Sequence, residues 1–378
     1  MKVALVCDWL TNVGGAEKVL LELHRLYPDA PIYTSKYDPK GIDWFKDADV
    51  RTGWLQKFPS KMRRFLGPFR QRYFSHLKLE GYDLVISVTG AEAKSVRVPD
   101  GVHICYCHVP TQYYWQMYNA YLKNPGFGLL NPLVRICFKL LVGPLRRADF
   151  KAAQRPDYYV TISEYAKQQI KWAYGKDATI IHPPVEIDNF KNSETSKAQG
   201  DSQYIITSRQ VNWKRVDLAV RACMMTQRKL TVIGEGPEHK KLVKIAEGAG
   251  NIKFLPLMKK EKLAEKLAEA KGYLFPSLEP FGIAPVEALA AGCPVIALGE
   301  GGALDYVEDG KNGVLFEEQT AKSLAEAILR FEKMKFNRTR VSKTADKFSV
   351  VRFDEEIKCF VKINGTKGKN EKDRQKVK

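Results

Sequence analysis

Glu279 and Glu287 flank a glycine-containing loop, with seven residues between the two glutamates. The short apolar run at 272–275, just before the loop, predicts a buried strand. Pro285 fits the first position of a helix that follows the loop, which puts Glu287 in the first turn of that helix. The sequence therefore predicts a strand, a loop containing Gly282 and a helix, with one carboxylate in the loop and one at the helix start.

This arrangement combines a site for an anion with two acceptors of hydrogen bonds. The free N–H groups and the roughly +0.5 charge at a helix start suit a phosphate. Two carboxylates would repel that phosphate, so we expect them to bind hydroxyl groups on either side of it. A nucleotide sugar has this pattern of ribose, diphosphate and sugar. In the alternative interpretation, Glu287 is an ordinary first-turn glutamate favoured by the helix dipole and Glu279 is an exposed loop residue.

Arg209 and Lys214 follow another predicted strand, at 204–207. Two cations at the carboxyl end of a strand would complement a diphosphate, since arginine binds two oxygens with its fork and lysine acts as a point charge. A solvated surface pair is the alternative. Because the Glu279 loop should end on the same edge of the sheet, we favour a shared site.

Glycines and a histidine follow other predicted strands. Gly14 and Gly15 form either a tight turn or a place where the backbone approaches a phosphate, and His108 is either structural or part of a site. Neither Gly14-Gly15 nor Gly234 with Gly236 completes the G-x-G-x-x-G fingerprint, so we expect no nicotinamide cofactor.

We expect no metal and no other cofactor. Asp47-Ala48-Asp49 matches the Asp-x-Asp metal signature of another transferase fold, but it lies in a polar stretch rather than after an apolar strand. We therefore interpret it as a turn. The sequence contains no other Asp/His/Glu cluster, no nucleophile elbow and no Walker loop.

The 378 residues carry a net charge of +18, which calls for an anionic partner. The basic-aromatic segment 57–78 holds seven basic residues and no acidic one. A second segment, 129–145, is apolar and should be broken at Gly143-Pro144, so it would lie in a membrane interface or in the core. Taking both segments together, we favour contact of 57–78 and 129–145 with an anionic membrane surface. No recognition helix or RNA-binding motif supports nucleic acid.

Seven scattered cysteines lack the spacing of a zinc site, and no signal peptide or long apolar span is visible. These features predict a cytoplasmic protein that associates peripherally with the inner face of the cell membrane.

Predicted strands and helices alternate along the chain, which is typical of doubly wound parallel sheets. We predict an α/β protein with two Rossmann-like domains, 1–186 and 187–344. A helix at 345–363 would cross back to the first domain, and 364–378 would form a basic disordered tail. In such sheets ligands bind at the carboxyl ends of strands, where the glycine-rich turns lie.

The spacing of Glu279 and Glu287 resembles that of retaining glycosyltransferases with the GT-B fold, most closely glycosyltransferase family 4. Nearly the whole chain shares this resemblance. The segments that carry it are Gly14-Gly15-Ala16-Glu17, Cys107-His108-Val109-Pro110, Ile162-Ser163-Glu164-Tyr165, Arg209 with Lys214, Gly234-Glu235-Gly236-Pro237-Glu238, Ala291-Gly292-Cys293-Pro294-Val295 and Gly310-Lys311-Asn312-Gly313. The surroundings of His108 are similar to those of bacterial mannosyltransferases that build O-antigen or exopolysaccharide repeats from GDP-mannose.

The resemblance implies an acceptor-binding first domain and a donor-binding second domain that face a cleft and work without a metal. The catalytic residues that it implies are Arg209, Lys214, Glu279 and His108. The donor-binding residues that it implies are Gly14, Gly15, Gly234, Phe281, Gly282, Ile283 and Glu287. Asp305 stands where many relatives have glutamate, so we leave it unassigned.

The implied reaction is retaining transfer of a hexose, α-mannose from GDP-mannose, to a lipid-linked saccharide in the assembly of a cell-surface polysaccharide. The expected partners are a nucleotide-sugar donor, that acceptor and the cytoplasmic membrane surface. The alternatives are a UDP-sugar donor (UDP-glucose or UDP-N-acetylglucosamine), a same-fold epimerase and, in another class, a non-catalytic protein that binds membranes or nucleic acid.

Overall fold

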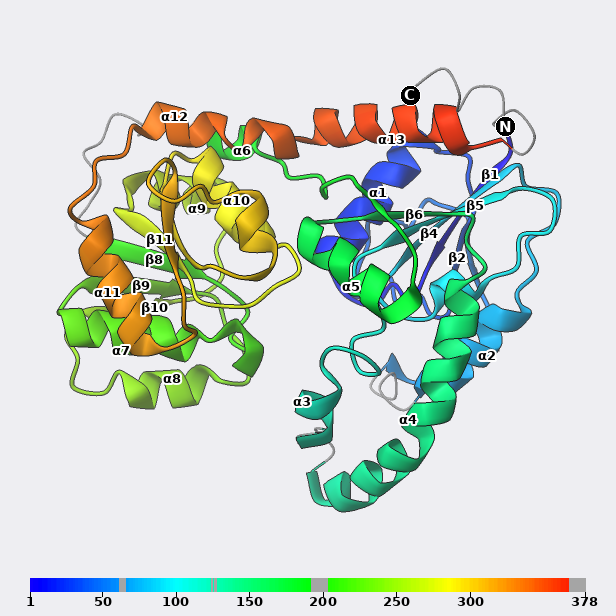
Figure 1. Cartoon of the computed structure of the whole chain (residues 1–378), viewed down its shortest axis with the longest axis horizontal. Coiled ribbons are helices and arrows are strands. Elements are labelled where there is room, and N and C mark those ends of the chain that lie inside the picture. The colour runs from blue at the N-terminus through cyan, green and yellow to red at the C-terminus, as the bar shows by residue number, and fades with distance from the viewer. Residues whose placement is uncertain (61–65, 124, 126–127, 192–202, 367–378) are drawn as a thin grey trace. The chain divides into compact units, whose positions relative to one another are not determined.

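The computed structural model describes residues 1–60, 66–123, 125, 128–191 and 203–366 (Figure 1). Two compact units make up the chain. Unit 1 comprises Met1–Pro183 and Phe353–Lys378, and unit 2 comprises Pro184–Arg352.

Among the described residues of unit 1, seven parallel strands form one sheet in the order β3-β2-β1-β4-β5-β6-β7. The strands are β1 (Val3–Cys7), β2 (Ile32–Thr34), β3 (Val50–Thr52), β4 (Leu84–Thr89), β5 (Val102–Cys107), β6 (Tyr158–Thr161) and β7 (Thr179–Ile180). Every residue of β1, β4 and β5 is buried, which explains why these strands are continuous apolar runs rather than alternating ones.

Unit 1 also contains helices. They are α1 (Gly15–Leu26), α2 (Gly67–His76), α3 (Tyr118–Lys123), α4 (Asn131–Ala153), α5 (Glu164–Tyr174) and the part of α13 (Val350–Asn364) that belongs to unit 1. The Ser163 hydroxyl caps α5 by accepting a hydrogen bond from the Ala166 N–H. Phe353, Ile357 and Val361 form the buried stripe of α13.

Among the described residues of unit 2, six parallel strands follow the order β10-β9-β8-β11-β12-β13. The strands are β8 (Gln203–Thr207), β9 (Lys229–Ile233), β10 (Ile252–Leu255), β11 (Gly272–Phe275), β12 (Val295–Leu298) and β13 (Gly313–Phe316). The helices are α6 (Asp188–Lys191), α7 (Val216–Thr226), α8 (His239–Ile245), α9 (Lys260–Glu269), α10 (Ile283–Ala290), α11 (Ala321–Phe331) and α12 (Arg338–Lys343). Apolar faces of α7 and α11 share one core with the strands.

The predicted α/β class with two doubly wound parallel sheets is confirmed. In each sheet the order of the strands reverses at one point, between β1 and β4 in unit 1 and between β8 and β11 in unit 2. Ligands of such sheets bind outside the carboxyl ends of the strands at this point. The short strands β3 and β13 were not predicted, because three or four residues carry little periodic signal.

Two local predictions are wrong. The helix α4 continues through Gly143-Pro144, where a break was predicted. A proline removes the backbone hydrogen bond to the carbonyl four residues earlier, which is that of Leu140, and Leu140 is exposed, so water can reach this carbonyl. The helix α10 begins at Ile283, so Pro285 is its third residue and Glu287 lies beyond its first turn.

Several predicted segments include residues outside the described ranges: part of the segment 57–78, residues 192–202 of the predicted second domain, and the tail beyond residue 366. Asn364, the first residue of the predicted tail, ends α13. Among the described helices, none is long and apolar enough to cross a membrane.

Candidate functional site

Loops that follow four strands of unit 2 meet at the carboxyl edge of its sheet. The Ser208 N–H, after β8, donates to the Ile233 carbonyl at the end of β9 at 3.0 Å. The Gly302 N–H, after β12, donates at 2.8 Å to the carbonyl of Glu279, which follows β11. Because these loops contact one another, residues far apart in the sequence share one rim.

Lys214 and Glu279 form an ion pair across this rim, between the loops that follow β8 and β11. The Lys214 Nζ contacts Glu279 Oε2, while the Ser277 hydroxyl donates to Glu279 Oε1 at 2.7 Å. The lysine side chain is 27% exposed and the glutamate side chain 15% exposed. Both charged groups are therefore held in place and still reach solvent, as groups that bind a ligand must.

The helix α10 begins directly beside this pair. Gly282 has φ +91°, and a Cβ atom there would lie 2.6 Å from Phe275 Cζ. Only glycine tolerates this backbone conformation and this contact. Ile283 and Ala284 are the first helical residues, and their N–H groups have no acceptor within the helix, which leaves them available for an anion.

Together Lys214, Glu279, Gly282 and Ile283 line a cavity of about 30 Å³. This volume holds roughly one water molecule. A nucleotide sugar is far larger, so it would have to lie across the open rim rather than inside the cavity.

Arg209 lies on the same loop as Lys214 but does not line the cavity, and its side chain is exposed. The buried Gln210 fixes the backbone beside it by donating from Nε2 to the Gly234 carbonyl at 2.5 Å. Gly234 has φ +118°, and a Cβ atom there would lie 2.3 Å from the Ser208 carbonyl oxygen. Gly234 therefore lets two loops pack closely, which is a structural reason for a glycine at this position.

Glu287 lies outside the cavity and is partly exposed. Burial raises the pKa of the Tyr273 phenol, hydrogen bonds with Thr207 lower it, and the charges of Glu279 and Glu287 raise it. Both carboxylates are therefore near Tyr273, which is buried at the start of β11. Since Glu287 lies beyond the first turn of α10, the helix dipole does not account for a glutamate there.

Phe281 is held by aromatic neighbours. The Tyr306 hydroxyl donates to the Phe281 carbonyl at 2.8 Å, and the two rings are 5.6 Å apart between centroids. Phe348 packs against the same two rings. The next residue before Tyr306 is Asp305, whose backbone carbonyl accepts a hydrogen bond from Lys347. Tyr306 thus positions the loop that carries Glu279.

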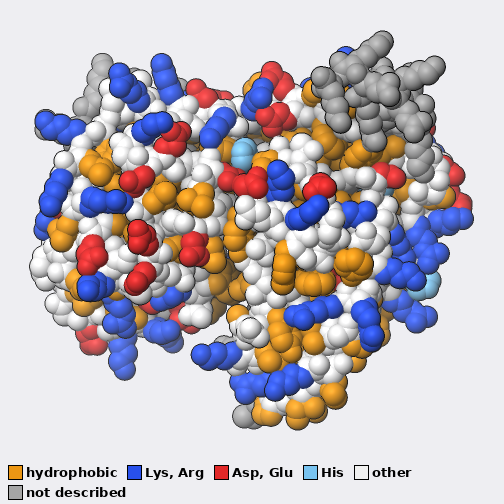
Figure 2. Space-filling view, in the orientation of Figure 1, with side chains coloured by type: hydrophobic (Ala, Val, Ile, Leu, Met, Phe, Trp, Pro, Cys, Tyr) orange, Lys and Arg blue, Asp and Glu red, His pale blue; other side chains and the backbone are white. Residues whose placement is uncertain are grey.

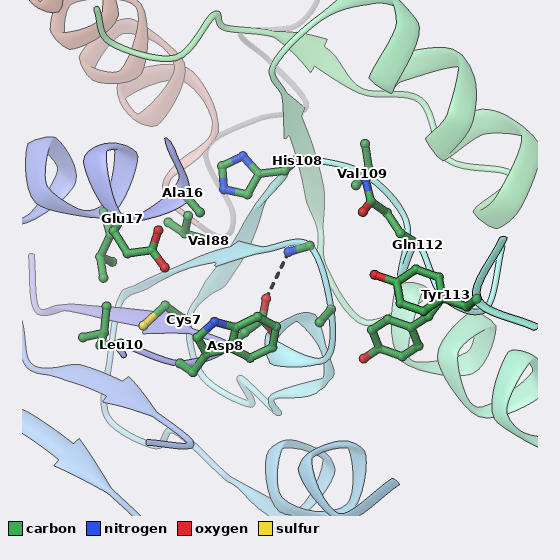
Figure 3. Close-up of a pocket in the computed structure, with 15 residues that line it drawn as sticks. Cys7, Asp8, Leu10, Ala16, Glu17, Val88, His108, Val109, Gln112 and Tyr113 are labelled. Atoms are coloured by element: carbon green, nitrogen blue, oxygen red, sulfur yellow. Dashed lines mark hydrogen bonds between the residues drawn. The ribbon is translucent and has the colours of Figure 1, made fainter. Parts of the chain in front are cut away.

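Unit 1 has its own cavity, of about 340 Å³, where its strand order reverses. Its walls come from the carboxyl ends of β1, β4 and β5 and from the start of α1. Figure 3 shows His108 between Glu17 on one side and Gln112 with Tyr113 on the other. The volume lies within the range that binds small molecules.

His108 lines this cavity, as its position after β5 suggested. Burial lowers its pKa to about 4, so the imidazole is neutral at pH 7. Its Nε2 atom has no hydrogen-bond partner within the described part of the chain. His108 therefore lies in the cavity wall with a buried, neutral Nε2 atom, and its role in a site stays a prediction.

Gly14 has an extended backbone, with φ −160°, and caps α1, so the interpretation as a tight turn is wrong. A Cβ atom at Gly14 would lie 2.7 Å from Glu17 Oε2. The small size of Gly14 therefore makes room for the Glu17 carboxylate in the first turn of α1. Gly15 is the first residue of that helix, and its contact with a phosphate stays a prediction.

Two residues of these sites were missed from the sequence. Ser277 orients Glu279, and its position two residues before that glutamate, directly after a predicted strand, was the available signal. Asp8 follows β1 and accepts hydrogen bonds from Thr89 Oγ1 and from the N–H groups of Gly90 and Ala93. These bonds join the loops after β1 and β4 and thereby shape the cavity (Figure 3).

Neutral histidines should make unit 1 sensitive to acid. Burial lowers the pKa of His103 to about 3 and that of His108 to about 4, whereas an unfolded histidine titrates near 6.5. The unfolded state therefore binds more protons below pH 6.5. The stabilisation is complete above pH 6.5 and decreases by up to about 1.4 kcal/mol per pH unit for each histidine as the pH falls toward 4.

Urea unfolding at pH 7.0, 5.5 and 4.5, followed by tryptophan fluorescence, measures this loss. Five of the six tryptophans belong to unit 1, so the signal reports mainly on that unit. His103→Gln should reduce the dependence on pH, while His76→Gln, at an exposed position, should leave it unchanged. The same pH dependence in wild type and His103→Gln would contradict the assignment.

One family model matches a part of the chain that lies within unit 2. Residues 188–348 match the family model described as "Glycosyl transferases group 1". This range contains Lys214, Glu279 and Glu287, the charged residues of the rim.

The whole chain shares its fold with GT-B glycosyltransferases, as predicted. The crystal structure of Anabaena Alr3699/HepE in complex with UDP superimposes with a TM-score of 0.69 and 20% identity, covering 96% of this chain and 100% of that one. At this identity the likeness concerns the fold.

Curated relatives include mannosyltransferases. The GDP-mannose-dependent alpha-(1-6)-phosphatidylinositol monomannoside mannosyltransferase of Mycolicibacterium smegmatis is 27% identical over 198 residues, 46% of this chain and 52% of that protein. The alpha-1,3/1,6-mannosyltransferase alg2 of Schizosaccharomyces pombe is 24% identical over 375 residues, 83% of this chain and 70% of that protein. The chain thus spans about half the length of several curated relatives that it matches, the archaeal and mycobacterial ones among them.

Proposed function

We propose that this protein is a retaining glycosyltransferase of family 4 that transfers α-mannose from GDP-mannose to a lipid-linked saccharide in the assembly of a cell-surface polysaccharide. The observation that carries this proposal is the Lys214–Glu279 pair beside the start of α10, at the point where the strand order of unit 2 reverses. A cation, free N–H groups and a fixed carboxylate at one rim suit a diphosphate joined to a hydroxyl-rich sugar.

In the proposed reaction, the bond between the sugar C1 and the leaving diphosphate oxygen breaks, and the acceptor oxygen bonds to C1 on the same face. The acceptor proton moves to the diphosphate oxygen that leaves. Lys214 and Arg209 stabilise the charge that develops on the diphosphate, a role that needs prearranged cations rather than a nucleophile. Glu279 orients the sugar, and Glu287 binds the ribose hydroxyls.

The remaining donor-binding assignments are Gly14, Gly15, Gly234, Phe281, Gly282 and Ile283. The backbone of Gly282 and Ile283 lies at the α10 start and suits the phosphate. Phe281 contributes through its position in the loop, because Tyr306 already occupies its carbonyl.

Unit 1 would bind the acceptor and unit 2 the donor. The cavity beside His108 has aromatic and polar walls, which suit a saccharide. Peripheral contact with the inner face of the cell membrane would bring the enzyme to a lipid-linked acceptor.

The choice of GDP-mannose as the donor rests on the mycobacterial and yeast relatives, whose names specify mannose transfer. A UDP-sugar is the second candidate, because structural neighbours of the chain include Anabaena Alr3699/HepE with UDP-glucose, at 19% identity and a TM-score of 0.66.

A thermal-shift screen with GDP, GDP-mannose, UDP, UDP-glucose and UDP-N-acetylglucosamine tests the proposal. A ligand that binds only the folded protein stabilises it by about 2.7 kcal/mol at a concentration 100 times its Kd. We expect GDP and GDP-mannose to raise the melting temperature, and Lys214→Ala to reduce that shift. A shift with UDP compounds alone would select the second candidate, and no shift with any of them would refute nucleotide-sugar binding.

A further inference from the structure

The first half of α4 presents an apolar face to solvent. Leu133, Ile136 and Leu140 are 60%, 58% and 72% exposed, and Leu141 is 50% exposed. Their spacing of three, four and one residues places them on one side of a helix. We call these four residues the α4 ridge. Such a row of large exposed side chains is unusual for a soluble surface and indicates an interaction site.

The ridge is exposed because the opposite side of α4 is already occupied. Phe138 packs against Tyr118 of α3, with ring centroids 5.4 Å apart. Arg135 donates to the carbonyls of Leu122 and Lys123, at 3.1 and 2.6 Å. The helix is therefore held along its inner face, and the ridge is the side that faces solvent.

The C-terminal half of α4 fixes the helix to unit 1. The fully buried Asp149 forms an ion pair with Lys94 at 2.7 Å. Arg146 lies over the rings of Trp115 and Tyr118. The direction in which the ridge faces is thus set by buried contacts rather than by the ridge itself.

Basic residues border the ridge. Lys139, Arg147 and Lys151 are exposed, and the one acidic residue of α4, Asp149, is buried. Figure 2 shows hydrophobic and basic side chains gathered over the part of unit 1 that contains α3 and α4. A partner must therefore offer an apolar interior beneath a negatively charged surface.

We propose that the α4 ridge docks on an anionic lipid bilayer, with the helix lying in the plane of the interface. A 23-residue helix is about 35 Å long, and α4 is not apolar enough to cross a membrane, which together suit an interfacial helix. The negative charge of the lipid headgroups complements Lys139, Arg147 and Lys151. A second copy of this chain would instead bring equal positive charges together.

This surface differs from the basic-aromatic segment 57–78. Within the described part of that segment, Arg70 pairs with the buried Glu92, and Phe74 is fully buried. These two side chains cannot reach a membrane. The proposal deepens the proposed function, since a lipid-linked acceptor requires access to a bilayer, but binding to lipid needs no nucleotide sugar.

Co-sedimentation with vesicles tests the ridge. Wild type should pellet with vesicles of equal parts phosphatidylcholine and phosphatidylglycerol, and less at high salt. Leu133→Gln/Ile136→Gln/Leu140→Gln should lower the partition coefficient at least tenfold. The matched control Met225→Gln/Leu257→Gln/Leu329→Gln, at exposed positions of unit 2, should bind as wild type does. Equal binding by the ridge variant and wild type, or no binding by wild type, would overturn the proposal.

A probe on α4 tests the geometry directly. Cys137 lies next to Ile136 and is exposed, as is Cys359, whereas the other five cysteines are buried. In a Cys359→Ser background, an environment-sensitive dye on Cys137 should shift to the blue when anionic vesicles are added, and lipids brominated in their acyl chains should quench it. No shift would overturn the proposal, as would a shift caused instead by self-association that light scattering detects without vesicles.

The experiments distinguish failure of the proposed function from failure of the proposed docking surface. A ridge variant that loses vesicle binding but keeps the thermal shift with a nucleotide sugar supports docking independently of chemistry. If no nucleotide sugar stabilises the wild type while it still binds vesicles through the ridge, the proposed function fails and the docking surface stands.

Discussion

Replacing Lys214 by alanine should lower turnover about 10²–10³-fold, the usual cost of removing one group that stabilises transition-state charge. The Lys214 ammonium is fixed by the Glu279 carboxylate beside the α10 start, so it is positioned before a diphosphate arrives. Folding should change little, because a partly exposed ion pair contributes about 0–1 kcal/mol to stability. Steady-state rates with the donor selected by the thermal-shift screen, together with the melting temperature, measure both quantities.

Glu279→Ala should also lose most turnover, for a different reason. Without the carboxylate, Lys214 loses the partner that orients it, and the sugar loses an acceptor for its hydroxyls. Ser277→Ala removes only the hydrogen bond to Glu279 Oε1 and should cost less.

A matched control distinguishes a specific role of Lys214 in turnover from a general effect of breaking an ion pair in unit 2. Lys266 and Glu269 form a pair of 2.6 Å in unit 2 with intermediate exposure, away from the rim. Lys266→Ala should keep wild-type turnover. If Lys214→Ala turns over substrate as wild type does, or if Lys266→Ala is equally impaired, the assignment of Lys214 is wrong.

Replacing Asp149 by asparagine should lower the free energy of unfolding of unit 1 by about 3–5 kcal/mol, the cost of leaving a buried charge without its partner. Asp149 accepts hydrogen bonds from Trp115 Nε1 at 2.7 Å, Tyr174 at 2.8 Å and Thr111 Oγ1 at 2.9 Å, in addition to its ion pair with Lys94. Burial lowers the pKa of Lys94, but the charge of Asp149, its hydrogen bond and further neighbouring groups together raise that pKa above its ordinary value, so the lysine stays charged.

Urea unfolding followed by tryptophan fluorescence measures this loss, since Trp115 contacts Asp149 directly. The control Asp177→Asn removes an exposed partner of Lys171 and should not shift the unfolding midpoint measurably. Replacing both charges, in Lys94→Met/Asp149→Leu, should restore part of the stability because no unpaired charge remains. A small effect of Asp149→Asn would show that the buried pair does not anchor α4.

The α/β class and most strands could be predicted from the sequence. Strands such as β4 and β5 are buried on both faces of a parallel sheet, so they appear as short continuous apolar runs between turns. The same pattern places loop residues at the carboxyl edge of a sheet, where Lys214 and Glu279 were expected. Local composition carries this information, because burial acts on each strand separately.

Other features depend on contacts between distant residues. The sequence does not show that Ser277 and Lys214 hold opposite oxygens of Glu279, because that geometry arises only when β8 and β11 become neighbours. The helix α10 starts two residues before the predicted start at Pro285. It follows directly on Gly282, whose positive φ cannot be read from helix propensities.

The α4 ridge shows most clearly which features the sequence predicts and which depend on tertiary contacts. By itself the sequence determined that 129–145 is apolar and carries basic residues, but not which side of the helix faces solvent. Tertiary contacts decided that question, since Asp149, Arg146 and Phe138 bind the inner face and leave Leu133, Ile136 and Leu140 outside. An apolar sequence pattern predicts that these side chains avoid water. Only the tertiary structure decides whether other parts of the same protein pack over them or whether they stay exposed for a partner.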